Sequence, residues 1–335
     1  MKYLLYIGPY PLNVGGISVH IRRLAGLMKN DYHIDYIDEG RNRYDGVFNI
    51  RDGNIIKYFL KVKKADIIHI HSGVWLLRAL NIFVCKILFR KKVLVTIHRD
   101  PNIEPHSKIT RFLLSKCDYA ILVNQEGYNA MFCSGDRCIY VLLPAFLPPQ
   151  MDDEPYLSEE ITKWIESARN RGAFIMCSNA WNLVLHNGED LYGLDMCIEA
   201  IRKLGLNYYL IFVVATNSDQ QELMSYYKKQ INSWGLTNNI LILEEPSSFV
   251  RILQKSDLVI RATNTDGDAI SVREALYYGK PVLASDVVKR PDGVYVFTTR
   301  DVEDMVTKIK MIEADKGATP YSCKDFYTLY KTMYG

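Results

Sequence analysis

Short apolar segments rich in strand-forming residues alternate with amphipathic helical segments along nearly the whole chain of 335 residues. Strands buried on both faces are apolar almost throughout, and strands separated by helices pair in parallel through helical crossovers. The pattern therefore predicts an α/β fold built from doubly wound parallel sheets. The expected strands lie at residues 2–8, 31–38, 66–71, 92–98, 118–124, 138–144, 173–179, 208–215, 239–245, 257–262, 281–285 and 293–297.

A proline-rich segment, PAFLPPQMDDEP at residues 144–155, interrupts this alternation. Proline disfavours both a helix and a central strand, so the segment is expected to link two domains. The predicted domains are a first Rossmann-like domain at 1–148 and a second at 149–317, with an aromatic C-terminal helix in 318–335 that packs back on the first. The two domains are expected to face each other across a cleft, with ligand at the carboxyl ends of the strands.

The composition is that of a globular protein without a strong charge bias. Hydrophobic residues make up 48% of the chain and charged residues 24%, which is ordinary for a globular protein and argues against disorder. A net charge of +3 permits an anionic ligand or an acidic membrane surface but gives no support for nucleic-acid binding. Seven dispersed cysteines are typical of reduced thiols in a cytosol. The opening apolar run is too short for a signal peptide, and no run reaches the ~18 apolar residues of a membrane span. The expected location is the cytoplasm, at most at the inner face of the cell membrane.

The segment 264–286, NTDGDAISVREALYYGKPVLASD, places carboxylates on both sides of an expected helix N-terminus. It follows a predicted strand, and Gly267 gives the loop conformational freedom. The first N–H groups of a helix have no partner within the helix and attract anions, so they form a phosphate site. Asp266 can accept hydrogen bonds from sugar hydroxyls, and Glu274, one turn into the helix, can reach a ribose diol. The N–H groups expected to face a diphosphate are those of Ala269, Ile270, Ser271 and Val272.

This arrangement, an acid followed after seven residues by EALYYGKPVLAS, resembles the signature of glycosyltransferase family four, within the GT-B superfold. The resemblance implies retaining transfer from a nucleotide sugar, with Glu274 on the nucleotide ribose and Asp266 on the donor sugar. It also implies that the second domain holds the donor and the first domain the acceptor. Other segments similar to the family are 15–25, 66–71, 95–98 and 193–201, so the resemblance covers most of the chain.

The first domain is expected to contribute a glycine pair and a histidine. Gly15 and Gly16 lie between the first strand and the first helix, where the backbone can approach a ligand; an ordinary turn is the alternative. The resemblance places this pair at the donor phosphate or the acceptor. It places His98, at the end of a strand, at the donor sugar or the reacting region; a structural histidine is the alternative. Asp266 and His98 are therefore the expected catalytic residues. The spacing is not G-x-G-x-x-G, so nicotinamide binding receives no support.

The chain lacks the basic pair that the resembled family carries in its second domain to neutralise the diphosphate. Ser178, Asn179 and Tyr192 stand where such bases are expected, and the first two remain candidate donor-binding residues. A leaving diphosphate still needs compensating charge. Arg261, at the end of a predicted strand, is the expected substitute, and Arg273 is the second choice.

Asp266 and Asp268 also form a D-x-D pattern, which in single-domain GT-A enzymes binds a divalent cation beside the diphosphate. Here the pattern lies late in the chain and leads into the GT-B helix. The expectation is therefore that no metal and no other cofactor is required.

The segment 75–92, WLLRALNIFVCKILFRKK, combines an apolar face with basic residues. It can rest on anionic lipid, where a lipid-linked acceptor would be found; a core-facing helix with a basic end is the alternative. The expected partners are a nucleotide sugar and a saccharide or lipid-linked acceptor, with peripheral membrane contact and without nucleic acid. The expected setting is bacterial surface-polysaccharide synthesis. A sugar-nucleotide epimerase and a non-catalytic GT-B subunit that binds a partner are the alternatives.

Overall fold

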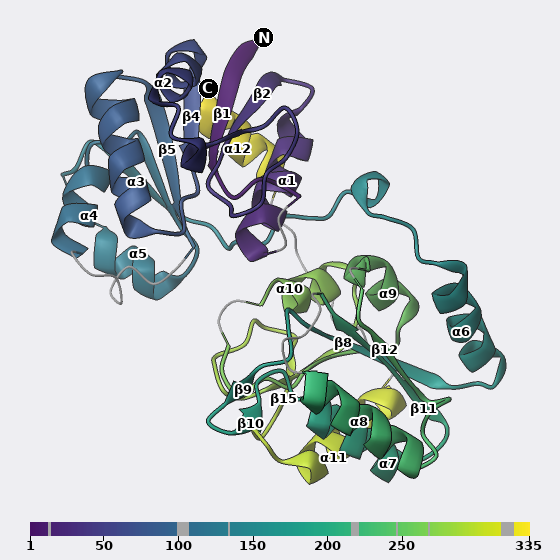
Figure 1. Cartoon of the computed structure of the whole chain (residues 1–335). Coiled ribbons are helices and arrows are strands. Elements are labelled where there is room, and N and C mark those ends of the chain that lie inside the picture. Colours follow the sequence, from purple (N-terminus) through teal and green to yellow (C-terminus); the bar gives the residue numbers. More distant parts are fainter. Residues whose placement is uncertain are drawn as a thin grey trace. The chain divides into compact units, whose positions relative to one another are not determined.

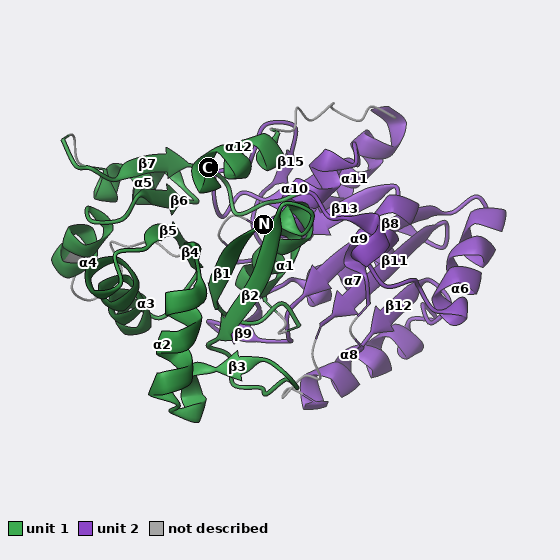
Figure 2. Cartoon of the chain, turned by 90° about the horizontal axis from the view of Figure 1, so that it is seen from above, with its two compact units in different colours: residues 1–147, 324–335 green, residues 148–323 purple. Residues whose placement is uncertain are grey.

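The structure is a computed structural model that describes residues 1–12, 15–98, 107–132, 135–215, 221–245, 247–266, 269–315 and 325–335 (Figure 1). The chain forms two compact units. Unit 1 contains Met1–Leu147 and Lys324–Gly335, and unit 2 contains Pro148–Cys323 (Figure 2). Each unit is built on a parallel sheet with helices on both faces, so the predicted α/β class is confirmed.

The sheet of unit 1 has seven strands in the order β3-β2-β1-β4-β5-β6-β7, and all neighbouring strands are parallel. The order changes direction between β1 and β4, which makes their carboxyl ends the switch point where α/β proteins place ligands. The central strands are apolar because both faces are covered. The strands are β1 (Lys2–Gly8), β2 (Tyr32–Asp38), β3 (Phe48–Asn49), β4 (Ile67–Ile70), β5 (Lys92–Ile97), β6 (Tyr119–Leu122) and β7 (Ile139–Leu142).

The helices of unit 1 form a layer on each face of this sheet. One layer, with α2, α3 and α4, packs on Leu5, Ile68 and Val95. On the other face α1 packs against α12, as Figure 1 shows. The helices are α1 (Gly16–Met28), α2 (Ile55–Lys64), α3 (Trp75–Ile82) with its π-helical continuation η2 (Phe83–Leu88), α4 (Ser107–Leu114), α5 (Gln125–Met131) and α12 (Phe326–Tyr334), with the 3₁₀ turn η1 (Ile50–Asp52).

The C-terminal helix α12 belongs to unit 1, although the whole of unit 2 precedes it in the chain. Its Tyr334 is fully buried, and the Tyr334 hydroxyl lies 2.8 Å from Nδ1 of His69 and 3.3 Å from the Tyr6 hydroxyl. Lys92 Nζ also donates to the carbonyl of Tyr334 at 2.9 Å. The aromatic tail therefore completes the core of unit 1.

The sheet of unit 2 has six parallel strands in the order β12-β11-β8-β13-β14-β15, with its switch point between β8 and β13. α7, α8 and α11 pack on one face, and α6, α9 and α10 pack on the other. The strands are β8 (Phe174–Ala180), β11 (Tyr208–Val214), β12 (Ile240–Leu243), β13 (Leu258–Arg261), β14 (Val282–Ser285) and β15 (Tyr295–Phe297). The helices are α6 (Glu159–Asn170), α7 (Leu194–Leu204), α8 (Gln221–Ser233), α9 (Phe249–Lys255), α10 (Ile270–Tyr277) and α11 (Val302–Asp315), preceded by the 3₁₀ turn η3 (Met151–Asp153).

Three very short strands have no counterpart in the sequence prediction. They are β3 and the hairpin strands β9 (Leu185–His186) and β10 (Glu189–Asp190). Two residues contain no period from which a strand can be recognised, so only tertiary pairing defines them. Among the described residues, every helix is too short or too polar to cross a bilayer.

Candidate active site

The residues expected to bind the donor meet at the carboxyl edge of the unit 2 sheet. β8 and β13 are neighbours at the switch point, and all strands of a parallel sheet end at the same edge. Ser178 and Asn179 lie near the end of β8, and Arg261 is the last residue of β13. Nη1 of Arg261 lies 3.4 Å from the carbonyl oxygen of Asn179. The fold therefore brings together three predicted site residues that are distant in sequence.

Asp266 lies just beyond this edge and is held by two arginines. Arg261 donates from Nε to Oδ2 at 3.0 Å and from Nη2 to Oδ1 at 2.8 Å. Arg290 donates from Nη1 to Oδ2 at 2.7 Å. The side chains of Arg261, Asp266 and Arg290 are 12%, 6% and 3% exposed. We call these three residues the Asp266 triad; because it combines two guanidinium groups with one carboxylate, it retains one positive charge.

The protonation state of Asp266 follows from this pairing. Burial alone would raise the pKa of the carboxyl group, because it disfavours the charged form. The hydrogen bonds and charges of Arg261 and Arg290 outweigh burial and hold the pKa of Asp266 below its ordinary value. Asp266 is therefore ionised at neutral pH and can accept hydrogen bonds.

Arg290 is a member of the site that the sequence analysis missed. Its Nε donates to the carbonyl of Ser285 at 2.9 Å, and its Nη2 donates to the Ser285 hydroxyl at 3.0 Å. That hydroxyl in turn donates to the carbonyl of Thr263 at 2.6 Å, just after β13. The available signal was position: Arg290 follows the end of β14 by five residues, at the same sheet edge as Arg261.

α10 begins at Ile270, shortly after Asp266, as the sequence predicts. The first-turn N–H groups of Ile270 and Ser271 have no acceptor within the helix. Glu274, one turn further, is buried with 5% exposure on the same helix face as Ser271. Gly267 and Asp268, and with them half of the D-x-D pattern, lie outside the described residues.

One N–H group of α10 is not available as predicted. The N–H of Val272 donates to the carbonyl of Ala269 at 3.2 Å, because the first turn closes tightly on its N-cap residue. Arg273 also donates its N–H to Ala269, at 3.4 Å, and its side chain is half-buried on α10. An anion at this helix end would therefore meet the N–H groups that precede Val272.

Several buried polar atoms at the same edge have no hydrogen-bond partner within the described part of the chain. They are Ser178 Oγ, Asn179 Oδ1, Asn182 Oδ1 and Asn264 Oδ1. Leaving such an atom unpaired costs roughly 1–3 kcal/mol, so a ligand hydroxyl that donates to one of these oxygens would recover part of that cost. The ring of Tyr192 lies 5.3 Å from the Arg261 guanidinium.

A glycine allows α7 to begin directly against the end of β13. Gly193, the N-cap of α7, has a φ of 71°. A Cβ at this position would lie 2.3 Å from the carbonyl oxygen of Ala262. Only glycine fits such a close approach, which places the N-terminus of α7 beside the residue that follows Arg261.

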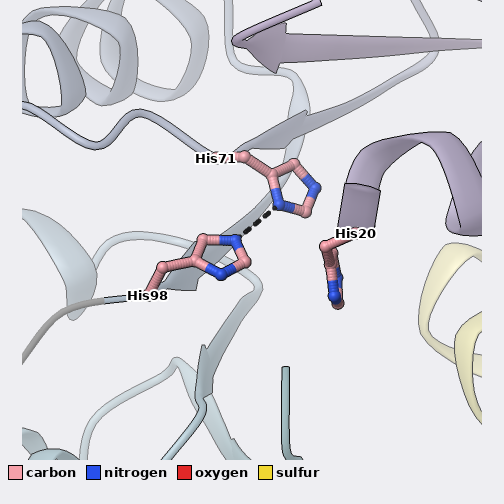
Figure 3. Close-up of side chains that lie close together, drawn as sticks. All are labelled: His20, His71 and His98. Atoms are coloured by element: carbon pink, nitrogen blue, oxygen red, sulfur yellow. Dashed lines mark hydrogen bonds between the residues drawn. The ribbon is translucent and has the colours of Figure 1, made fainter. Parts of the chain in front are cut away.

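Unit 1 gathers three histidines at the carboxyl edge of its own sheet (Figure 3). His71 follows β4, His98 follows β5, and His20 lies on α1. Nδ1 of His71 lies 3.1 Å from Nε2 of His98, and the His20 ring centroid is 5.3 Å and 5.1 Å from the two other rings. His20 Nδ1 lies 2.7 Å from the carbonyl of Ala145, so Nδ1 carries the proton. His98 therefore packs against the rings of His71 and His20.

All three imidazoles are neutral at pH 7. Burial lowers the pKa of His20 to about 4. It also lowers the pKa of His71 and of His98 well below the ordinary value, and neighbouring histidines add to both shifts. A neutral imidazole can donate one hydrogen bond and accept another, which suits contact with sugar hydroxyls. His69 has a different role, because its nitrogens lie 2.8 Å from the Tyr334 and Thr96 hydroxyls in the core.

The same three histidines could hold a metal ion. Their ligand atoms all lie within 4.8 Å of one another, and neutral imidazoles are common zinc ligands. Burial is the main cause of the lowered pKa of His20 and of His98, and the positive charges of Arg23 and Arg78 add smaller contributions.

The predicted glycine pair lies in unit 1 at the start of α1. Gly15 is the N-cap, with a φ of 150°, and Gly16 is the first helical residue. The carbonyl of Gly15 accepts from the N–H of Val19 at 3.0 Å. The pair therefore directs the helix that carries His20 into the histidine cluster.

Solved structures of several proteins share this architecture. The Anabaena protein HepE, solved in complex with UDP, matches with a TM-score of 0.66 and 14% identity over 95% of this chain and 92% of that chain. A glycosyltransferase from Rickettsia africae matches with a TM-score of 0.66 and 16% identity over 99% and 93%. The lipopolysaccharide outer core galactosyltransferase WaaB matches with a TM-score of 0.56 and 12% identity over 100% and 94%.

The chain has the GT-B glycosyltransferase fold. Residues 182–325 match the family model for glycosyl transferases group 1. The matched segment contains the whole Asp266 triad and Glu274. No curated protein sequence matches the chain significantly.

Proposed function

We propose that this GT-B protein is a retaining glycosyltransferase that moves a sugar from a nucleoside diphosphate sugar to a saccharide or lipid-linked acceptor. The observation that carries the proposal is the ionised Asp266, held by two arginines directly before α10, inside the segment that matches glycosyl transferases group 1. The UDP complex of HepE supports a nucleotide-sugar donor.

Each residue of the unit 2 site has a role in this proposal. Glu274 accepts hydrogen bonds from the ribose hydroxyls, and Asp266 accepts them from the donor sugar. The N–H groups of Ile270 and Ser271, together with the helix dipole, meet the diphosphate. Arg261 and the net positive charge of the triad compensate the negative charge that grows as the glycosidic bond breaks. The triad thus takes the place of the basic pair that the sequence lacks.

The proposed chemistry is a displacement on one face of the donor sugar. The acceptor oxygen bonds to the anomeric carbon as the bond to the diphosphate breaks, and the departing phosphate oxygen takes the acceptor's proton. Asp266 is not placed to act as a nucleophile, because both of its oxygens are bound by guanidinium groups. His98, neutral and 3.1 Å from His71, is the residue we propose for a hydrogen bond to a sugar hydroxyl.

The setting we propose is bacterial surface-polysaccharide synthesis in the cytoplasm. The support is the structural similarity to WaaB, which is named as a lipopolysaccharide outer core galactosyltransferase.

No metal takes part in the proposed reaction, so turnover should survive EDTA. Loss of transfer in EDTA with recovery in magnesium would instead favour a metal role for Asp266 and Asp268.

The decisive experiment is a thermal-shift screen with UDP-, GDP-, ADP- and dTDP-sugars, beginning with UDP-glucose. A ligand at ~100 times its dissociation constant should stabilise the protein by ~2.7 kcal/mol. Glu274→Ala should weaken binding of the free nucleoside diphosphate by roughly 1.5–3 kcal/mol, because a charge-assisted hydrogen bond is lost. Unchanged affinity in the folded variant would remove Glu274 from the site.

Product analysis then separates the alternatives. A transferase consumes the donor only with an acceptor present and forms a new glycoside. An epimerase would release nucleotide and an epimerised sugar without an acceptor, and a non-catalytic subunit would bind a donor without converting it.

A further inference from the structure

Three neighbouring helical segments cover one face of unit 1 as a continuous layer. Tyr58 of α2 donates its hydroxyl to Asn81 of α3 at 2.7 Å. The rings of Phe59 on α2 and Phe89, just after η2, lie 5.6 Å apart. α3 also packs against α4, and Figure 1 shows α2, α3 and α4 together on the same side of the sheet. We call the solvent side of α2, α3, η2 and α4 the outer helical face.

The outer helical face exposes an unusual number of large apolar side chains. Along α3 and η2, Leu76, Leu80, Phe83 and Ile87 follow one another at helical spacing, and the first three are 60%, 49% and 52% exposed. The opposite side of the same helix faces the core and buries Arg78, Asn81, Ile82 and Cys85. The exposed apolar side chains therefore do not take part in filling the core. The remaining exposed apolar residues of the face are Ile55, Ile56 and Leu60 on α2, Leu88 on η2, and Ile109 and Phe112 on α4.

The helices of this face carry charge of one sign. The helical segments 55–64, 75–88 and 107–114 contain no Asp or Glu. In unit 2, α6, α7, α8, α10 and α11 each contain at least one acid, and the short helix α9 contains none. The exposed bases on or beside the outer helical face are Lys57, Lys63, Lys64, Arg90, Lys108, Arg111 and Lys116.

We propose that the outer helical face docks on an anionic lipid membrane. Apolar side chains that enter the headgroup layer, on helices that carry bases and no acids, match the recognition chemistry of an acidic bilayer surface. A second copy of this chain would bring one basic face against another, and the absence of acids makes that contact repulsive. The structure thus favours the membrane-resting interpretation of residues 75–92, with α2 and α4 as additional parts of the surface.

The position of this face suits an acceptor that is itself anchored in lipid. α3 begins four residues after His71, so its N-terminal end lies at the sheet edge that carries His71 and His98. This second step rests on the proposed function, because it assumes that His98 faces the reacting sugars. The docking itself needs neither donor nor acceptor.

The test is sedimentation of the full chain with vesicles of phosphatidylcholine alone and of phosphatidylcholine mixed with phosphatidylglycerol. Binding should be strong only to the mixed vesicles and should fall as salt is raised, because salt screens charge. Lys63→Gln with Lys108→Gln should lower the partition constant about 25-fold, at about fivefold for each base. Leu80→Ser with Phe83→Ser should lower it at least about tenfold.

Matched variants in unit 2 provide the controls. Lys229→Gln with Lys310→Gln removes two exposed bases, and Leu206→Ser with Met311→Ser removes two exposed apolar side chains. Both control pairs should leave vesicle binding unchanged, and circular dichroism should show that every variant is folded.

Failure to bind the mixed vesicles would overturn the proposal, as would equal losses in the control pairs. So would a concentration-dependent dimer that the Leu80→Ser, Phe83→Ser variant abolishes, because that result assigns the face to a second copy. Since the assay contains no nucleotide sugar, its failure is distinguishable from failure of the proposed transferase activity.

Discussion

The Asp266 triad offers a sharp test of how unit 2 holds its site. Arg290→Met removes one guanidinium from Asp266 and preserves the approximate length of the side chain. Asp266→Asn removes the carboxylate and leaves two guanidinium groups facing each other. The nearby Lys289→Met serves as a control, because Lys289 is exposed and adjacent to Arg290 in sequence.

The structure determines the expected magnitudes. Two unit charges ~4 Å apart attract by about 4 kcal/mol at an effective dielectric constant near 20, and breaking a buried pair typically costs about 3–5 kcal/mol. Because Arg261 still binds both oxygens of Asp266, Arg290→Met should lower the free energy of unfolding by less, about 2–3 kcal/mol. Asp266→Asn should cost about 3–5 kcal/mol. In the double variant these costs should fail to add by about 1–3 kcal/mol, since the attraction can be lost only once.

Urea unfolding followed by tryptophan fluorescence measures these differences. Trp164, Trp181 and Trp234 lie in unit 2, and Trp75 is the only tryptophan of the sequence in unit 1, so the signal reports mainly on unit 2. Additive losses, within about 0.5 kcal/mol, would refute the reasoning.

Acid provides a second check with a definite sign. The lowered pKa of Asp266 means that its pairing contributes stability above the ordinary pKa of about 3.9 and loses it as the pH falls through the lower folded value. The difference between the wild type and Arg290→Met should therefore shrink in strong acid. A difference that stays constant with pH would show that Arg290 acts through packing alone.

Three further outcomes are expected. Gly193→Ala should lower the free energy of unfolding by at least about 2 kcal/mol in urea, whereas Gly205→Ala, where an added Cβ meets nothing within 4 Å, should lower it by only about 1 kcal/mol. His20 stays neutral in the folded protein, so its contribution to the free energy of unfolding is complete above pH ~6.5 and falls by about 2 kcal/mol between pH 7.5 and 5. In His20→Gln the free energy of unfolding should fall less over this pH range. An unchanged pH dependence would contradict the neutral state of His20. Arg261→Ala should reduce turnover more than donor affinity, with partial recovery in Arg261→Lys; normal turnover in a less stable protein would make Arg261 purely structural.

The sequence by itself determined the α/β class, because buried parallel strands are apolar throughout and helical faces recur with a period of 3.6 residues. It also located the start of α10, since an acid, a glycine and then an amphipathic segment form a local signal that needs no distant partner. For the same reason it placed Asp266, Glu274 and Arg261 near one strand end. These features depend only on residues that are close together in the sequence.

The tertiary structure alone decided which distant side chains meet. Arg290 lies 24 residues beyond Asp266, and only the pairing of β13 with β14 brings the two to one edge. His20 lies on a helix, and His71 and His98 each follow a strand; the order of those strands in the sheet cannot be deduced from the local sequence pattern. Spacing along a chain specifies a helix or a strand, whereas the charge and hydrogen bonds of a site depend on which strands become neighbours.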